Sequence, residues 1–268
     1  MSRQPNKVEL IGIYGDDLTH GLSAWTSTSR DLTEEKRNRV DKLLDLLAPS
    51  GHETPFEKSM IHFLVTVETA SHIHILKHRI GVSVNGESAR YKELKEDKYL
   101  VPDDWSEEEQ AELVQHMETS LDKYHKCLNR LIASGMSRKR AKESARFYLP
   151  YANQVTLDVS FNFRSFVHFL NLRNKPDAQV EIQQIAQKML DLVIESGKFP
   201  LSLKAFGLVE DKHDPVADSY DSGMGFVGLK ASDLIFDFHE TRKELEEKLR
   251  KAGVSNAKIK KALYSKGE

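Results

Sequence analysis

Two segments of the chain, at positions 60–67 and 154–163, carry an apolar residue at every second position. Successive side chains of a β-strand point to opposite faces, so this period of two predicts two strands that each bury one face. A shorter strand is expected over residues 8–14, before a turn at 15–17. The buried faces would consist of Ile61, Phe63, Val65 and Val67 in the first strand and of Val155, Leu157, Val159, Phe161 and Phe163 in the second.

Apolar residues three and four positions apart predict helices between and after these strands. Residues that favour a helix N-terminus stand where several of them begin, namely Thr33, Thr54, Ser106 and Asp177. Thr54 would be followed by Pro55 at the first helical position, with Glu57 completing a capping box. The expected helical ranges are 33–47, a short helix from 54, 69–79, 106–134, 136–147, 164–173 and 177–196, with two more at 232–252 and 255–264.

This mixture of strands and helices is that of the α/β (α+β) class. All the expected strands lie within residues 1–208, which we take as one domain. Residues 209–268 are expected to form a loop and a charged helical C-terminal extension. Its charges alternate in sign, which is typical of a solvated helical hairpin.

Composition narrows the classes of protein to consider. With 268 residues, 39% hydrophobic residues and 12 Phe, the chain can build a full core. A net charge of -2 argues against a strongly basic nucleic-acid-binding protein. The single cysteine, Cys127, permits no intramolecular disulfide and fits a reducing, cytoplasmic environment. We expect no signal peptide and no membrane span, because no apolar run approaches the about 20 residues that a bilayer requires.

The densest group of candidate ligand-binding residues lies at positions 77–91. A polar, Gly-containing run in its centre is expected to be a flexible loop. Guanidinium groups match phosphate oxygens in pairs, and the N–H groups of a small-residue loop can surround the same anion. The stretch therefore predicts a phosphate site, but a solvated basic turn, or cations that complement a helix dipole, would have the same composition. The side chains concerned are Lys77, His78 and Arg79 before the loop and Ser88, Arg90 and Tyr91 after it.

Two further pairs lie on predicted helices. His74 and His78 are four residues apart, a spacing found in zinc sites, but no Glu follows the first His as a zincin motif requires. We therefore expect no metal. Arg164 and Arg173 are nine residues apart, which separates them by about 180° around a helix. We expect them to serve two ligands, or sites on two subunits, rather than one ligand.

Four blocks of the sequence, in order, resemble the motifs of the flavin-dependent thymidylate synthases. The resemblance spans roughly residues 8–208, and several ordered blocks are more specific than one motif. The blocks are Gly-His-Glu-Thr-Pro-Phe-Glu at 51–57; Lys77-His78-Arg79 followed after eight residues by Ser88-Ala89-Arg90; Ala145-Arg146 with Leu149-Pro150; and 162–173 with Ala178-Gln179 and Glu181-Ile182.

The resemblance implies an α/β homotetramer with a central, mainly antiparallel sheet flanked by helices, and with active sites built from several subunits. Such an enzyme makes dTMP from dUMP, with methylenetetrahydrofolate as carbon donor and FAD reduced by NADPH. Arg173 would activate the uracil. The FAD-binding residues would be Thr54, Lys77, His78, Arg79, Asn162, Arg164 and His168, with His52 near the flavin. The dUMP-binding residues would be His74, Glu87, Ser88, Ala89, Arg90, Arg146 and Arg173.

The chemistry implied by the family requires no catalytic cysteine, because the flavin supplies the hydride. Cys127 is accordingly expected to be a small apolar filler on a helix. Ser88 has no base beside it in the sequence, which favours contact with a phosphate or ring over a role as nucleophile.

Three positions depart from the family pattern. Lys77 stands in place of an Arg, His74 in place of a Gln, and Gly86-Glu87 shifts the acidic residue. Two alternatives stay open on this account: a related flavin enzyme that modifies the pyrimidine differently, for example by hydroxymethylation, and an inactive nucleotide- or flavin-binding homologue. The presence of Arg90, Arg146 and Arg173 argues against the second.

Overall fold

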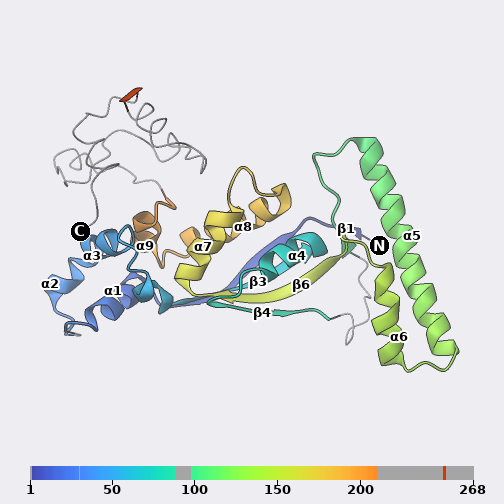
Figure 1. Ribbon diagram of the computed structural model, residues 1–268, viewed down its shortest axis with the longest axis horizontal. Coiled ribbons are helices and arrows are strands. Elements are labelled where there is room, and N and C mark those ends of the chain that lie inside the picture. Colours follow the sequence, from blue (N-terminus) through green and yellow to red (C-terminus); the bar gives the residue numbers. More distant parts are fainter. Residues whose placement is uncertain (1, 30, 89–97, 210–249, 252–268) are drawn as a thin grey trace. The chain divides into compact units, whose positions relative to one another are not determined.

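A computed structural model describes residues 2–29, 31–88, 98–209 and 250–251 of the chain (Figure 1). The strands are β1 (Ser2–Arg3), β2 (Lys7–Tyr14), β3 (Met60–Glu68), β4 (Val82–Gly86), β5 (Lys98–Tyr99) and β6 (Gln154–Phe161). The helices are α1 (Asp17–Trp25), α2 (Glu34–Arg37), α3 (Val40–Leu47), α4 (Thr69–Leu76), α5 (Glu107–Ala133), α6 (Arg138–Ala145), α7 (Phe163–Arg173), α8 (Val180–Glu195) and α9 (Pro200–Ala205), with 3-10 helices η1 (Thr54–Glu57) and η2 (Arg146–Tyr148).

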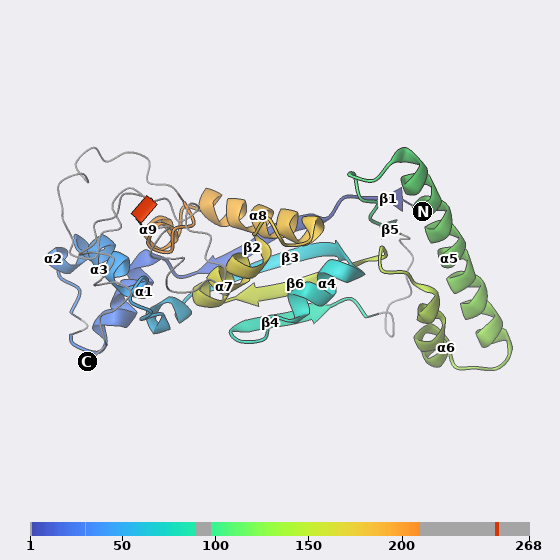
Figure 2. The same cartoon turned by 45° about the horizontal axis from the view of Figure 1, so that its top comes forward.

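The central sheet has four antiparallel strands in the order β2-β3-β6-β4. Strands β3 and β6 pair from Ile61 opposite Phe161 to Glu68 opposite Gln154. Helices α4, α7 and α8 lie on one face of this sheet in both views (Figures 1 and 2). The expected fold class, an antiparallel sheet flanked by helices, is confirmed.

Alternation along the two central strands is confirmed by burial. The side chains of Ile61, Phe63, Val65 and Val67 are fully buried, as are those of Leu157, Val159 and Phe161. At the start of β6 the alternation fails, because Gln154 is fully buried and Val155 only partly. The buried apolar side chains pack against apolar residues of α7 and α8, including Phe166, Phe169 and Met189. Replacing a buried Phe of this kind by Ala costs about 3–5 kcal/mol of unfolding free energy, so this face fixes where the helices lie. On the opposite face, His62 Nε2 lies 2.5 Å from Asp158 Oδ1.

Several predicted boundaries are wrong for identifiable local reasons. Residues 15–17 are not simply a turn, because Asp16 caps α1 in a capping box with Thr19. The single helix expected over 33–47 is two helices, since Arg39, at φ -121° and ψ 7°, lies outside the helical region between them. The second alternating strand ends at Phe161, and Phe163 begins α7 after the cap residue Asn162.

The expected caps have mixed outcomes. Thr33 accepts a hydrogen bond from the Lys36 N–H, and Ser106 from the Glu109 N–H, as predicted. Thr54 is not a cap, because it lies inside η1, whose first turn has no side-chain cap. Asp177 is not a cap either: α8 begins at Val180, preceded by Gln179, without a side-chain cap.

Cys127 lies on α5 and packs against the small core between α5 and α6. This agrees with its expected role as a small apolar filler. The helical extension predicted for 209–268 lies outside the described residues, apart from Val209, Arg250 and Lys251, and stays a prediction.

A buried polar chain joins α1 to α9. Ser202 Oγ donates to Asp17 Oδ1 at 2.5 Å, so it accepts the Nδ1 proton of His20 at 2.8 Å. His20 Nε2 then accepts from Ser59 Oγ, also at 2.8 Å. The His20 ring is fully buried and stacks on Phe199 at 5.3 Å. Burial lowers the pKa of His20 from 6.5 to about 4, which keeps the ring neutral.

We predict that His20 makes the protein less stable in acid. Its pKa is lower in the folded chain than in the unfolded chain, so the unfolded chain takes up the proton first as pH falls from 6.5 towards 4. This preferential protonation of the unfolded chain removes at most about 3 kcal/mol of unfolding free energy between pH 6.5 and 4. The unfolding free energy of His20→Phe should be about 1–3 kcal/mol lower at pH 7, because Ser59 loses its acceptor and Ser202 keeps only its bond to Asp17. It should also fall less steeply in acid. Urea unfolding between pH 4.5 and 7.5 measures both effects. His116→Phe, on an exposed position of α5, is the control, and an unchanged acid slope in His20→Phe contradicts the prediction.

Candidate active site

The N-terminus of α7 docks onto the chain segment that follows α4. Asn162 N donates to Gly81 O at 3.0 Å, and Ser165 Oγ donates to Ile80 O at 2.8 Å. The Asn162 side chain in turn accepts from Ser165 N at 2.8 Å and caps the helix. Gly81 has φ 64°, a left-handed conformation that favours glycine. These contacts hold the Lys77–Gly81 segment against α7.

The central run of the stretch 77–91 is a strand rather than a flexible loop. Helix α4 ends at Leu76, earlier than expected, and Lys77 is its C-cap residue. Val82 to Gly86 form β4, which pairs with β6. The partly buried Val82 and Val84 alternate with exposed residues, a short signal that the sequence contains. A strand about 17 Å long therefore stands between the Lys77–Arg79 group and Ser88.

Two predicted site residues contact the side chain of Arg173, and a third lies beside one of them. Arg173 Nε donates to His78 Nε2 at 3.1 Å, and Nη1 lies 3.3 Å from His74 Nδ1. The ring of His168 is 5.8 Å from that of His78, which also meets the edge of Phe169 at 5.0 Å. The C-terminal ends of α4 and α7 thus converge on one guanidinium.

Both histidines around Arg173 are biased towards the neutral form. Burial, followed by the cation of Arg173, then His168 and His74, lowers the pKa of His78 to about 4. Burial and Arg173 also lower the pKa of His74, against an opposing effect of Glu68. Arg173 has these neutral partners and, in the described part of the chain, no carboxylate partner. Its positive charge is therefore not balanced by an anion and suits an electron-rich ligand.

Arg164 points to a different group. Its Nε donates to Glu53 at 2.6 Å and its Nη1 to Glu57 at 2.5 Å, while the side chain stays 45% exposed. Glu57 thus binds Arg164 rather than completing a capping box. Arg164 and Arg173 thus have separate partners, and the expectation that they serve two ligands, or sites on two subunits, stays a prediction. His52 and Thr54, in the same turn, have exposed side chains.

The other predicted dUMP-binding residues that the structure describes, Glu87, Ser88 and Arg146, come from other parts of the chain than Arg173 and its two histidines. Glu87 follows β4 and its Oε2 accepts from Thr156 N at 2.9 Å. Ser88 beside it is partly exposed, and Ala89 and Arg90 lie outside the described residues. Arg146 is exposed in η2, which precedes β6, whereas α7 follows that strand. Figures 1 and 2 show α6 beside α5 and apart from α7.

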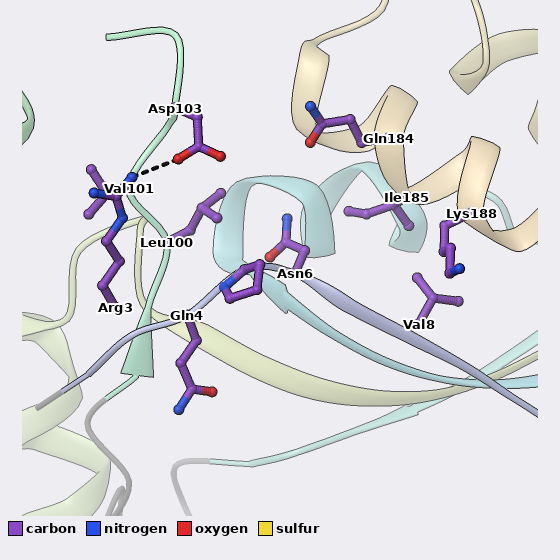
Figure 3. A pocket seen from close by; sticks show the side chains of 11 residues that line it. Arg3, Gln4, Asn6, Val8, Leu100, Val101, Asp103, Gln184, Ile185 and Lys188 are labelled. Carbon is purple, nitrogen blue, oxygen red and sulfur yellow. Dashed lines mark hydrogen bonds and ion pairs between the residues drawn. The ribbon is translucent and has the colours of Figure 1, made fainter. Parts of the chain in front are cut away.

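A cavity of about 380 Å³ lies elsewhere, between the N-terminal segment, the chain after β5 and α8 (Figure 3). Its lining includes Asn6, Val8, Val101 and Lys188. Arg3 at its edge donates to Asp103 at 2.6 Å. None of the predicted site residues that the structure describes lines this cavity.

Sequence reasoning missed the anchor of α4. Glu68 is only 4% exposed and caps this helix, with Oε1 accepting from Ser71 N at 3.0 Å. Asn6 Nδ2 donates to the other oxygen at 2.6 Å, and Gln154 donates to Asn6 Oδ1. A carboxylate directly before a predicted helix is a recognisable cap signal. Its partner Asn6, just before β2, and Gln154 of β6, which binds Asn6, are both remote from it in the sequence.

Known proteins give consistent matches to this chain. A family model described as "Thymidylate synthase complementing protein" matches residues 12–198. The flavin-dependent thymidylate synthase of Pseudothermotoga lettingae is 36% identical over 186 residues, covering 67% of this chain and 80% of that protein. That of Thermosipho africanus is 30% identical over 216 residues, covering 74% and 90%. Among solved structures, the UMP/dUMP methylase PolB from Streptomyces cacaoi, bound with 5-Br dUMP, is 28% identical with a TM-score of 0.64, covering 77% of this chain and 96% of that one.

We predict that the docking of α7 makes Gly81 intolerant of any side chain. A Cβ at Gly81 would lie 2.3 Å from both Asn162 Nδ2 and Ser165 Oγ, whereas a Cβ at Gly197, at nearly the same φ of 63°, would meet nothing within 4 Å. Gly197→Ala should therefore cost about 1–2 kcal/mol from backbone strain alone. Gly81→Ala should cost at least about 3 kcal/mol more, or prevent folding. Urea unfolding of the two variants measures the difference, and equal costs would rule out the close contact.

Proposed function

We propose, from the premise that this chain belongs to the family of flavin-dependent thymidylate synthases, that it converts dUMP to dTMP with methylenetetrahydrofolate as carbon donor. The observation that carries the proposal is the charged guanidinium of Arg173, held by two neutral imidazoles rather than by a carboxylate. A fixed cation of this kind suits an electron-rich pyrimidine.

Arg173 would activate the substrate by electrostatics. The C5 atom of uracil is a poor nucleophile, and a guanidinium placed against the ring carbonyl and N3 favours the N3-deprotonated, more electron-rich ring. Arg cannot itself lose a proton under these conditions, so it stabilises the developing charge rather than acting as a base. Its task is therefore to hold its orientation while the ring gains charge.

The residues present fit a flavin dinucleotide. Lys77 and Arg79 have exposed cationic side chains, with no hydrogen bond or ion pair to the described part of the chain, and suit its phosphates. Thr54, His78, Asn162, Arg164 and His168, with His52 nearby, would complete the FAD site. Bound FAD, reduced by NADPH, supplies the hydride of the reaction. Arg164 would contribute only the N–H groups that Glu53 and Glu57 leave unused.

The dUMP site would combine residues of more than one chain. Glu87, Ser88, Ala89, Arg90 and Arg146 would hold the nucleotide, with His74 and Arg173 at its ring. The separation of Arg146 from Arg173 within one chain supports a homotetramer in which subunits share active sites. Cytoplasmic location, and action on a free nucleotide rather than on nucleic acid, belong to the same proposal. Among the described residues, no helix has the length and hydropathy needed to cross a bilayer.

A second candidate substrate is UMP. The solved relative named above is described as a UMP/dUMP methylase, and a further structure of it holds 5-Br UMP at 27% identity to this chain. The same purified protein, offered dUMP or UMP, distinguishes the two readings.

We predict that the purified protein is yellow and forms dTMP from dUMP in the presence of methylenetetrahydrofolate, FAD and NADPH. Mass spectrometry of the nucleotide product separates methylation from hydroxymethylation. Arg173→Ala should lower dTMP formation at least about 100-fold, because the electrostatic activation is lost. Arg37→Ala, on the exposed helix α2, is the matched arginine control. Unchanged turnover in Arg173→Ala would refute the activating role, and no methylated product would refute the proposed activity.

We predict that the protein in solution has four times the 30.6 kDa mass of one chain. Light scattering coupled to size exclusion gives this mass directly. Mixing inactive Arg146→Ala and inactive Arg173→Ala chains after dissociation should restore some activity if sites are shared, because some sites then receive both arginines. A monomer, or no restoration in mixed assemblies, contradicts shared sites.

A further inference from the structure

The contacts of Arg173 determine the protonation of its two histidine partners. A guanidinium has only N–H donors, so each ring nitrogen that it contacts must accept. His78 accepts at Nε2 and therefore carries its proton on Nδ1, while His74 accepts at Nδ1 and carries its proton on Nε2. A protonated imidazole has no acceptor left, so either histidine would lose its bond to Arg173 on taking up a proton.

Both histidines are held firmly in place. The ring of His78 is 8% exposed and packs edge-on against Phe169 at 5.0 Å. His74 sits one helical turn earlier on α4, whose N-terminus is anchored by the buried carboxylate of Glu68. The last turn of α4 and the residue after its C-cap therefore present two acceptors, four positions apart, to a single guanidinium.

We propose that His74, together with His78, is a positioning residue: the two neutral imidazoles orient the guanidinium of Arg173 towards the pyrimidine and release it when either takes up a proton. The inference rests on the proposed function for the identity of the ligand, but the contact itself does not. The remaining N–H of Nη1 and both N–H groups of Nη2 stay available for the ring carbonyl and N3.

Charged neighbours set the pH at which the two histidines take up a proton and lose their hydrogen bonds to Arg173. In the described part of the chain, Arg173 of α7 acts on both histidines. His168 of α7 and His74 act on His78, and Glu68 from the end of β3 acts on His74. The cation of Arg173 disfavours protonation of both rings, and Glu68 favours it at His74. Both histidines are therefore neutral at pH 7, and His74, the less buried and closer to Glu68, is the one expected to take up a proton first as pH falls.

Two substitutions at position 74 separate positioning from bulk structure. In His74→Gln the side-chain amide oxygen accepts a hydrogen bond but takes up no proton, whereas His74→Leu fills similar space without an acceptor. We expect His74→Leu to lower kcat for dTMP formation about tenfold at pH 7.5, as loss of one hydrogen bond to a charged group would, with a smaller change in KM for dUMP. His74→Gln should restore most of this loss and move the acid limb of the kcat profile to lower pH.

His116→Gln, on exposed α5, is the control and should keep the wild-type profile. Equal kcat values and equal pH profiles for His74→Leu and His74→Gln would overturn the proposal, whether both match the wild type or both are impaired. Absence of methylated product from the wild type would refute the proposed function instead. The contact of Arg173 with the two histidines would then be tested by the NMR titration below.

Histidine titration in the full-length protein provides that second readout. With the histidine rings labelled, NMR follows the protonation of His74 and His78 in the wild type and in Arg173→Met. Loss of the neighbouring cation should shift both midpoints to higher pH. Identical midpoints in the two proteins would show that Arg173 does not contact the histidines, and would overturn the inference independently of catalysis.

Discussion

The docking of the α7 N-terminus onto residues 80–81 is the contact on which the candidate site depends. Asn162 N and Ser165 Oγ donate to two successive backbone carbonyls, those of Gly81 and Ile80. This closes the end of α4 against α7 and leaves no space for a side chain at Gly81. Arg173, ten residues further along the same helix than Phe163, is thereby brought back to the histidines of α4. One local contact thus sets the geometry of a remote arginine.

The two arginines of α7 have opposite electrostatic surroundings. Arg164 is neutralised by Glu53 and Glu57 and is largely exposed, so water screens the pairs and they add little to stability. Their effect is to fix the turn 53–57 relative to α7. Arg173 has acceptors that carry no charge, so its full positive charge stays available. The same helix therefore carries one arginine that organises the structure and one suited to chemistry.

The sequence allowed the sheet and the family to be predicted because both depend on patterns within short segments. The alternation at 60–67 and 154–163 follows directly from burial of one strand face. Helix α1 and strand β4 were missed because they are short and largely polar. Contacts remote in sequence hold them: those of His20 with Ser59 and Ser202 for α1, and the pairing with β6 for β4. The sequence around Thr54 is that of a capping box. In the structure, however, Glu53 and Glu57 both bind Arg164, and Thr54 lies inside η1.

Motif blocks indicated which residues belong to the site, but not which of them meet in one chain. Arg173 and His74 are far apart in sequence, and only the packing of α7 on α4 brings them together. The central claim is that two neutral imidazoles of defined tautomer hold Arg173. Nitrogen chemical shifts of the histidine rings at pH 7 test it most directly. The account predicts a proton on Nδ1 alone in His78 and on Nε2 alone in His74; an imidazolium, or the opposite tautomer in either ring, would contradict it.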